Sequence, residues 1–349
     1  MLHIGMGKTG TSSIQSLLRR NRRRLREAGT LLYPRTPGRA RHARLSLSVR
    51  PTERLGNLPA WRRLGHPDPE QFREDFRRRL IVEVEESGLS RVLFSDEGLY
   101  GLQDQSLSEL AGLLARIGRN VRVVVYLRRQ DDHVVSHYQQ VVKVGETRRL
   151  TERIQQTDYS NTHDYYARLR SWTRLTDAGL LVVRRFEPEK FVEGSLYQDF
   201  FEAAAIPVRA DELTQVRARN ESLDAESVEF LRIVNLLRQE HHPATAALPR
   251  RNDPMVRRLA DVSTGPVLTA PDAQLDEVMS RWAGSNQAVA RELINDGDPL
   301  FRMPRRTRNT TTRQHLDPAR LDAIMALLEL PEQVHGPLRA RAEREAMVR

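Results

Sequence analysis

The sequence predicts an α/β protein with a doubly wound parallel sheet, followed by a mostly helical C-terminal appendage. In the first 200 residues, short apolar runs alternate with amphipathic helical patterns, which is typical of strand–helix–strand units. The run Val121–Leu127 is almost continuously apolar and rich in valine, as in a strand buried on both faces of a parallel sheet. Beyond about residue 208 such runs stop. We therefore expect residues 1–207 to form the α/β core and residues 208–349 a helical appendage that does not fold independently.

The first strand and helix follow from the start of the chain. Leu2–Ile4 is a short apolar run and predicts a strand. Gly5–Ser12 predicts a tight turn, and Ser13–Ala28 predicts a helix from its apolar period. This helix is expected to end at Gly29, because glycine tolerates the left-handed conformation in which many helices end. Thr30–Tyr33 then predicts a second short strand.

The middle of the core begins with an irregular segment. Arg35–Pro67 is rich in arginine, proline and glycine and has no apolar period, so we expect a loop. Asp68–Gln71 reads Asp-Pro-Glu-Gln, a capping sequence with proline at the first helical position, and predicts the start of a helix. Arg91–Ser95 predicts a strand, and the second capping sequence, Ser106–Glu109, predicts the start of another helix.

The remaining elements complete the core and the appendage. Val121–Leu127 and Leu180–Phe186 predict buried strands, and Asp131–Val144 predicts a helix between them. In the appendage, apolar residues recur at helical spacing over Phe230–Leu237, whereas residues 243–283 are rich in proline, aspartate and arginine and predict a loop.

The composition excludes several classes of protein. Arginine supplies 53 of the 56 basic residues, since lysine stands only at Lys8, Lys143 and Lys190, and the formal net charge is +10. No run approaches the roughly 18 apolar residues of a membrane-spanning helix, and we expect no membrane span. We expect no signal peptide either, because Met1–Met6 is too short for its apolar region. Cysteine is absent, which favours a cytoplasmic protein and excludes disulfides.

The first turn carries the strongest chemical signal. Residues 5–13 read Gly-Met-Gly-Lys-Thr-Gly-Thr-Ser-Ser, between the first predicted strand and the first predicted helix. Glycines let the backbone curl so that N–H groups face inward, and a helix N-terminus and a lysine add positive charge. This arrangement predicts a cradle for a phosphate-type anion. The residues expected to form it are Gly7, Lys8, Thr9, Gly10, Thr11 and Ser12.

The turn is not a Walker A motif. That motif has a glycine five positions before Gly7, where this chain has Leu2. A magnesium–triphosphate site is therefore less expected than a site for a more compact anion.

The segment Lys8–Ser12 resembles the 5′-phosphosulfate loop of sulfotransferases that use 3′-phosphoadenosine-5′-phosphosulfate (PAPS), which reads Lys-Ser/Thr-Gly-Thr-Thr/Ser after a strand. The resemblance covers about residues 2–207. It implies a P-loop NTPase-like fold and PAPS as co-substrate without a required metal. It implies transfer of the sulfuryl group by in-line displacement to a hydroxyl or amine of a small-molecule or glycan acceptor, with carbohydrates among the candidates. We expect the helical appendage, residues 208–349, to complete the acceptor side.

The resemblance also demands a second anion site, for the 3′-phosphate. In the family this site is an arginine at the end of a buried strand and a serine eight residues later. Here Arg128 follows the run Val121–Leu127, and Ser136 stands eight residues after Arg128. A guanidinium at the strand end and a hydroxyl in the first turns of the next helix suit one phosphate at the carboxyl edge of a sheet.

Two further roles are implied. In family members an aromatic residue after a later strand contacts the adenine, which places Phe186 there, although a core-packing role is equally expected. The family places its catalytic base at the end of the strand that here reads Val92–Glu97. We predict Glu97 as the base and Asp96 as the second candidate, with Lys8 stabilising the leaving phosphate oxygen.

The sequence departs from the family pattern in two places. The tryptophan that follows the loop in cytosolic members is replaced by Ser13, and the late Arg-Lys-Gly segment has no match. Arg302, Arg305 and Arg306 substitute for that segment by position only. The acids and histidines show no metal-ligand spacing, so we expect no metal site.

Two alternatives remain. A small-molecule kinase with a degenerate P-loop would need Mg²⁺ and ATP. A nucleic-acid-binding protein is suggested by the arginines of residues 19–26, but aromatic residues are only 6% of the chain and are not interleaved with them. We therefore expect no nucleic-acid partner.

Overall fold

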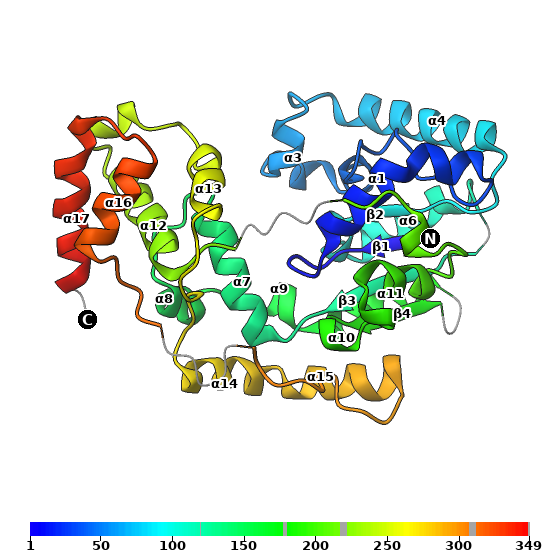
Figure 1. The fold of residues 1–349 in the computed structure, drawn as a ribbon. Helices are drawn as coiled ribbons and strands as arrows, with labels where there is room; N and C mark the ends of the chain where they lie inside the picture. The colour runs from blue at the N-terminus through cyan, green and yellow to red at the C-terminus, as the bar shows by residue number, and fades with distance from the viewer. Residues whose placement is uncertain (119, 177–179, 217–221, 307–311, 348–349) are drawn as a thin grey trace. The chain divides into compact units, whose positions relative to one another are not determined.

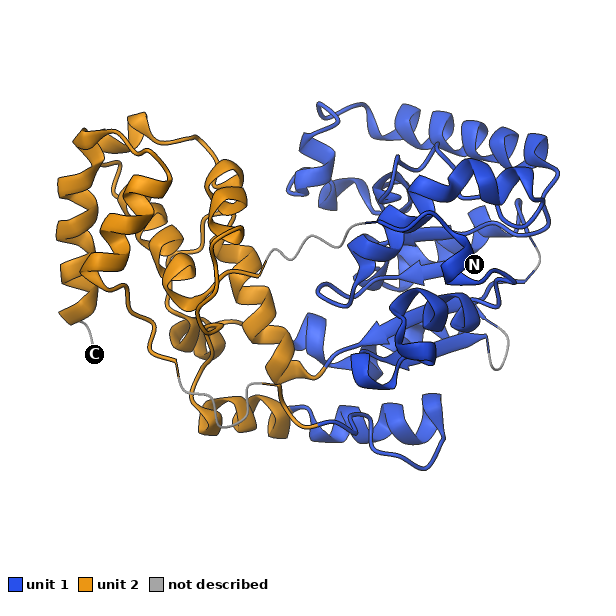
Figure 2. Cartoon of the chain, in the orientation of Figure 1, with its two compact units in different colours: residues 1–128, 159–218, 282–303 blue, residues 129–158, 219–281, 304–349 orange. Residues whose placement is uncertain are grey.

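The computed structural model describes residues 1–118, 120–176, 180–216, 222–306 and 312–347. By their internal contacts these residues form two compact units (Figure 2). Unit 1 comprises residues 1–128, 159–218 and 282–303, and unit 2 comprises residues 129–158, 219–281 and 304–349. The chain thus leaves unit 1 and returns to it twice. The predicted division of the chain after residue 207 stays a prediction.

A four-stranded, all-parallel sheet forms the centre of unit 1 (Figure 1). Its strands are β1 (Leu2–Ile4), β2 (Phe94–Asp96), β3 (Val123–Leu127) and β4 (Leu181–Arg185), in the spatial order β2-β1-β3-β4. The predicted α/β class with a parallel sheet is confirmed. Because all strands run in the same direction, their carboxyl ends meet at one edge, which here includes the turn after Ile4.

Side chains of β3 divide between the two faces of the sheet. Val123, Val125 and Leu127 pack into a cluster with apolar residues of α4 (Pro69–Ser87), α6 (Asp104–Leu114) and α10 (Tyr165–Trp172). Val124 and Tyr126 pack into a second cluster with α1 (Thr11–Glu27) and α11 (Leu196–Ala203). Helices therefore cover both faces, and every residue of β3 is buried, as its sequence predicts.

The helices of unit 1 differ in length. Its α-helices are α1 (Thr11–Glu27), α2 (Ala43–Ser48), α3 (Pro59–Arg62), α4 (Pro69–Ser87), α5 (Glu97–Tyr100), α6 (Asp104–Leu114), α9 (Ser160–His163), α10 (Tyr165–Trp172), α11 (Leu196–Ala203) and α15 (Ala283–Val289). The short 3-10 turns are η1 (Thr52–Arg54), η2 (Pro188–Lys190), η3 (Val192–Gly194) and η4 (Ala210–Glu212), and η6 (Ala290–Ile294) is a π-helical turn.

The predicted start of α4 is confirmed. Asp68 caps this helix by accepting a hydrogen bond of 2.8 Å from the backbone N–H of Gln71, and proline follows in the first turn. The predicted start of α6 at Ser106 is wrong. The helix begins at Asp104, whose carboxylate suits the positive end of the helix dipole, and Ser106 is buried inside it.

Two other predictions for unit 1 need correction. Thr30–Tyr33 is not a strand, since Leu32 forms only an isolated bridge to Val92 before Pro34, which has no N–H for a ladder. The segment Arg35–Pro67 is not an irregular loop throughout, because it contains α2, η1 and α3. Helices this short show no sequence period, and they depend on a small cluster of Leu47, Leu55 and Trp61.

Unit 2 contains helices and no strand among its described residues. They are α7 (Gln130–Val142), α8 (Leu150–Gln156), α12 (Ala225–Gln239), η5 (Pro243–Ala247), α13 (Asp253–Ala260), α14 (Asp272–Arg281), α16 (Pro318–Leu327), η7 (Glu332–Val334) and α17 (His335–Met347). The predicted helix over Phe230–Leu237 is confirmed within α12. The prediction that residues 243–283 form a loop is wrong, because α13 and α14 bury apolar residues such as Leu259 and Leu275 against the rest of the unit.

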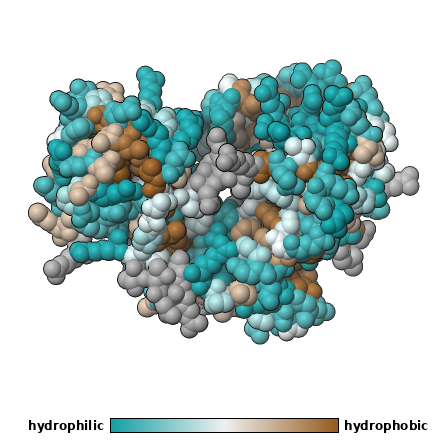
Figure 3. All heavy atoms as spheres, in the orientation of Figure 1, coloured by the Kyte–Doolittle hydropathy of each residue, from teal (hydrophilic) through white to brown (hydrophobic). Residues whose placement is uncertain are grey.

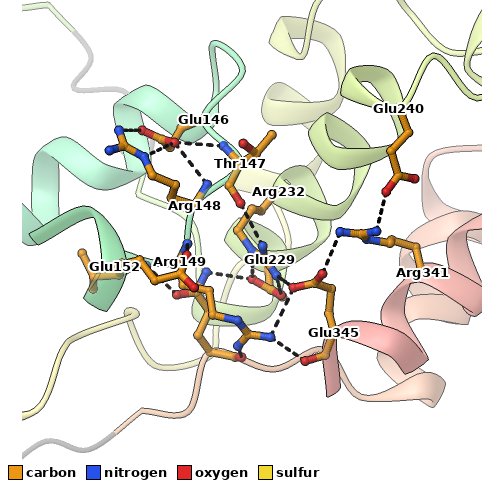
Figure 4. A network of polar contacts seen from close by, with 12 residues as sticks. Glu146, Thr147, Arg148, Arg149, Glu152, Glu229, Arg232, Glu240, Arg341 and Glu345 are labelled. Atoms are coloured by element: carbon orange, nitrogen blue, oxygen red, sulfur yellow. Dashed lines mark hydrogen bonds and ion pairs between the residues drawn. The ribbon is translucent and has the colours of Figure 1, made fainter. Parts of the chain in front are cut away.

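An arginine–carboxylate network ties the C-terminal helix of unit 2 to α12 (Figure 4). Arg232 pairs with Glu229 in the same helix at 2.6 Å and with Glu345 of α17. Arg149 also donates to the side chain of Glu345, at 3.3 Å. Arg232 and Glu229 are 3% and 1% exposed, so these charges are buried and depend on each other.

Among the described residues, no helix is long and apolar enough to cross a membrane. The face of unit 1 in Figure 3 is mostly hydrophilic over α1 and α4, in agreement with the charged sequence of both helices.

Candidate functional site

The turn between β1 and α1 adopts a conformation that depends on glycine. Gly10 has φ 75° and is the N-cap of α1, and a Cβ atom there would lie 2.3 Å from Cδ2 of Leu196. A Cβ atom at Gly5 would lie 2.5 Å from Cγ2 of Thr11. Lys8 also has a positive φ, 64°, which a residue with a side chain rarely adopts. The turn is therefore closely specified by its sequence.

Two threonines brace this turn from inside. The hydroxyl of Thr9 donates to the carbonyl oxygen of Met6 at 2.7 Å, and that of Thr11 donates to the same oxygen at 3.3 Å. Both side chains are buried, whereas Gly7, Lys8 and Ser12 are exposed. In the predicted anion cradle, two buried threonines therefore stabilise the turn, and Gly7, Lys8 and Ser12 form its exposed surface.

The start of α1 offers unused backbone donors. No side chain caps the helix, and no described residue accepts a hydrogen bond from the N–H groups of Thr11 and Ser12. The first N–H groups of a helix carry partial positive charge and have no partner inside the helix. Together with Lys8, they make this end of α1 suitable for an anion.

Arg128 and Phe186 lie beside the turn. Nη1 of Arg128 donates to the carbonyl oxygen of Lys8 at 3.0 Å, and the guanidinium carbon lies 5.8 Å from the ring centroid of Phe186. The backbone N–H of Phe186 donates to Leu127 at 2.7 Å, which continues the pairing of β4 with β3. The ring of Phe186 also approaches the position where Gly10 would carry a Cβ atom, at 3.4 Å. Residues predicted separately from three segments are therefore neighbours at one edge of the sheet.

Ser136 is placed differently from Arg128. Arg128 ends the first segment of unit 1, whereas Ser136 is half-buried in α7 of unit 2. Each is described within its own unit, and their predicted pairing stays a prediction.

The two predicted acids stand at the end of β2, where Asp96 is the last residue of the strand and Glu97 is the first residue of α5. Asp96 is paired in register with Ile4, and its carbonyl oxygen accepts from the N–H of Gly5 at 3.3 Å. Nε of Arg41 lies 2.5 Å from Oδ1 of Asp96 and 3.0 Å from Oε2 of Glu97. The side chain of Glu97 is 23% exposed and that of Asp96 is 0% exposed. Of the two acids, Glu97 is the one that a reactant can reach.

Asp96 keeps one oxygen without a hydrogen-bond partner. Its Oδ2 is buried and no described residue donates to it. Buried carboxylate oxygens are normally satisfied, so this atom is an unusual feature of the edge. A Cβ atom at Gly98 would lie 2.7 Å from it, which shows how closely the following turn covers the carboxylate.

Arg41 and Gln15 belong to this site and were not predicted. Nε2 of Gln15, on α1, donates to Glu97 at 3.5 Å and to the hydroxyl of Ser95 at 3.2 Å. Burial lowers the pKa of Arg41, but the charges of Asp96 and Glu97 outweigh it and raise that pKa. The sequence does not distinguish Arg41 from the many other arginines of the chain. Gln15 stands one helical turn after Thr11, and that spacing is the only sequence clue to it.

His3 and His42 pack in the core beside these acids. Both side chains are fully buried, and burial lowers the pKa of each to about 3. His3 contacts the hydroxyl of Ser95 at 2.8 Å, and Nδ1 of His42 accepts from the N–H of Ser95 at 3.2 Å. Neither histidine is exposed to a reactant, and both support β2.

The late arginines are held by carboxylates. Nε of Arg302 donates to Glu187 at 3.1 Å in unit 1. In unit 2, Arg305 is 5% exposed and pairs with Asp131, Asp272 and Asp276 at 2.8–3.2 Å. Arg305 is therefore a structural residue, since acids accept from both of its terminal nitrogens.

Among the described residues, no three His, Cys, Asp or Glu side chains are grouped so that they could hold a metal ion. No protein-family model and no solved structure matches the chain. A region of 114 residues is 32% identical to an uncharacterized protein of Archaeoglobus fulgidus. That region covers 33% of this chain and 30% of the archaeal protein. The match therefore spans less than a third of that relative's length.

Proposed function

We propose that this chain is a sulfotransferase that moves the sulfuryl group of PAPS to a hydroxyl or amine of an acceptor, on a doubly wound, P-loop NTPase-like core. The observation that carries the proposal is the hydrogen bond of 3.0 Å between Arg128 and the carbonyl of Lys8, with Phe186 beside the same guanidinium. The phosphosulfate loop, the strand-end arginine and the adenine-side aromatic were assigned from separate segments, and they are neighbours in unit 1.

The turn suits a phosphosulfate group. The free N–H groups of Thr11 and Ser12 and the exposed Lys8 present positive charge without the longer loop of a triphosphate site. Arg128 is tied to this turn and offers a planar fork for a further phosphate. Phe186 offers an aromatic face at the same edge, in keeping with an adenine contact.

The reaction assigns a role to each group. The acceptor oxygen forms a bond to sulfur while the bond from sulfur to the bridging phosphate oxygen breaks, and the hydroxyl proton passes to Glu97. Adenosine 3′,5′-bisphosphate leaves. Lys8 and the N–H groups of α1 stabilise the negative charge that develops on its phosphate oxygen. Arg41 and Gln15 hold the Glu97 carboxylate in place.

Binding of adenosine 3′,5′-bisphosphate to the full chain tests the proposal, measured by calorimetry and followed by turnover of labelled PAPS with a panel of acceptors. Lys8→Ala and Arg128→Ala should each weaken nucleotide binding by about tenfold or more, since each removes a charged contact to phosphate. Turnover should fall further, because Lys8 acts on the leaving oxygen. Lys190→Ala, which removes an exposed lysine outside the site, is the matched control and should leave both unchanged.

Absence of any binding signal with adenosine 3′,5′-bisphosphate would contradict the proposal. Binding of ATP that requires Mg²⁺ would instead support the kinase alternative. The ion pair between Arg41 and Asp96 weighs against that outcome, because a guanidinium occupies the acid nearest the turn.

A further inference from the structure

A second feature of unit 1 is a cavity of about 700 Å³ between α1 and residues 35–64. Seven of its thirteen lining residues are arginines. The others are proline, glycine, alanine and leucine, so neither an acid nor an aromatic ring lines it. Its volume is within the range of small-molecule binding pockets.

In the part of the chain that the structure describes, six of the seven arginines that line this cavity have no ion-pair partner, and the exception is Arg41, which pairs with Asp96 and Glu97. Among the described residues, no partner accepts a hydrogen bond or ion pair from the side chains of four lining arginines, which are Arg19, Arg35, Arg39 and Arg63. Arg44 donates only to a carbonyl oxygen, that of Thr36, at 3.4 Å. In unit 2, by contrast, arginines such as Arg232 are paired with buried carboxylates. The cavity therefore brings together several arginines that have no acid partner within the described ranges.

Arg22 lies among the other positive charges of the cavity. Its Nη2 donates to the carbonyl oxygen of Arg39 at 2.7 Å and its guanidinium lies 5.3 Å from the ring centroid of Tyr33, while its Nε is buried without a partner. Burial lowers the pKa of Arg22 most strongly. The charges of Tyr33 and Glu83 raise it, whereas those of Arg35 and Arg19 lower it. An anion in the cavity would relieve this repulsion.

One residue, Arg41, links the cavity to Glu97, the predicted base. Arg41 lines the cavity, and its Nε is 3.0 Å from Oε2 of Glu97. Gln15, which also contacts Glu97, is one helical turn before the lining residue Arg19 on α1. The cavity and the predicted base therefore share a contact with Arg41, although Glu97 itself does not line the cavity.

We propose that this cavity binds the acceptor, and that the acceptor is an acidic oligosaccharide carrying several sulfate or carboxylate groups. Guanidinium forks match such groups in a bidentate way, and the lining has no ring on which a nucleobase could stack. The assignment as acceptor rests on the proposed function, since transfer needs a hydroxyl or amine, which a simple polyphosphate does not have. Binding of the polyanion itself does not depend on that function.

The test uses the full chain and calorimetry in 150 mM salt, about the physiological ionic strength. The probe is a sulfated chondroitin tetrasaccharide, with uncharged maltotetraose as the reference. Arg19→Ala with Arg63→Ala should weaken tetrasaccharide binding by about tenfold or more. The matched control, Arg20→Ala with Arg62→Ala, removes two exposed arginines from the same two helical segments outside the cavity and should change binding less than about twofold. Maltotetraose should not bind.

Several results would overturn the inference. These are absence of tetrasaccharide binding to the wild-type chain, equal weakening by both double variants, or tighter binding of a single-stranded oligonucleotide through the same arginines. Tripolyphosphate binding that matches the tetrasaccharide in affinity and in arginine dependence would overturn the saccharide assignment.

Adenosine 3′,5′-bisphosphate serves as the second probe, and its affinity should be the same in both double variants. If wild-type chain binds the tetrasaccharide through Arg19 and Arg63 but does not bind this nucleotide, the sulfotransferase proposal fails while the polyanion site stands. If it binds the nucleotide and not the tetrasaccharide, the cavity assignment fails alone.

Discussion

At the scale of single residues, the turn after β1 shows why particular residue types stand where they do. Gly10 has a positive φ and a close neighbour in Leu196, whereas a Cβ atom at Gly7 would meet nothing within 4 Å. Lys8, one of three lysines in the chain, stands in this turn with a positive φ. A compact ammonium on a flexible stem suits a tight turn better than a planar guanidinium does.

Gly10→Ala should destabilise the chain by about 1–2 kcal/mol, because an alanine in the left-handed region is strained. It should also weaken binding of adenosine 3′,5′-bisphosphate, since relief of the strain shifts the start of α1. Gly7→Ala is the control for stability and should change the unfolding free energy by less than about 0.5 kcal/mol. Urea unfolding measures both. Equal unfolding free energies for the two variants would show that the turn does not require glycine at residue 10.

At the scale of elements, α12 and α17 are joined by charge as well as by apolar packing. Arg232 lies between Glu229 of its own helix and Glu345 of α17 (Figure 4). The two neighbouring carboxylates, through hydrogen bonds and charge, outweigh the effect of burial and raise the pKa of Arg232. The pair with Glu229 is buried, so loss of one partner leaves an uncompensated charge in the other.

Arg232→Ala should lower the unfolding free energy of the unit by about 3–5 kcal/mol, because Glu229 would remain buried without its guanidinium. Arg281→Ala, which breaks an exposed pair with Glu277 on α14, should cost less than about 1 kcal/mol. Replacing both buried partners, as Arg232→Met with Glu229→Leu, should cost less than the single change. Denaturant unfolding followed by circular dichroism gives the three values. Similar costs for Arg232→Ala and Arg281→Ala would contradict a buried role for the network.

At the scale of the whole molecule, acid should destabilise unit 1 through its buried histidines. The pKa of His3 and that of His42 are lowered by burial from 6.5 to about 3. Between pH 6.5 and about pH 3 the unfolded chain therefore binds protons that the folded chain does not, so stability is full above pH 6.5 and falls as the pH decreases. The expected slope is about 1.4 kcal/mol per pH unit for each histidine.

Unfolding free energies measured from pH 7 to pH 5 check this slope, above the range where most carboxylates titrate. His42→Asn should remove about half of the decrease in unfolding free energy that the two histidines cause. The control His66→Asn, at an exposed position, should leave the slope of unfolding free energy against pH unchanged. A flat profile for the wild-type chain would show that these rings are accessible to protons in the folded state.

Below pH 4.5 unit 2 should lose stability too. Although burial raises the pKa of Glu146, hydrogen bonds from Arg148 and the charge of Arg153 lower it to about 2.

Much of the α/β core could be predicted because its signals are local. The continuous apolar run of β3, the amphipathic period of α1 and the cap of α4 each depend on residues close in sequence. The short helices α2 and α3 and the helices α13 and α14 were missed, since they owe their stability to contacts with distant residues and carry a weak period of their own.

The same division holds for the candidate site. The glycine-dependent turn, its lysine and the residues that end β2, β3 and β4 could be predicted from the sequence, because strand ends and turns follow from local chemistry. The contacts of Arg41 and Gln15 with Glu97 could not be predicted, since they depend on how distant segments fold together. The same holds for the seven arginines that line one cavity, six of which have no ion-pair partner among the described residues. The charge of an arginine is the same everywhere in the sequence, whereas its partners depend on which distant segments the fold brings to it.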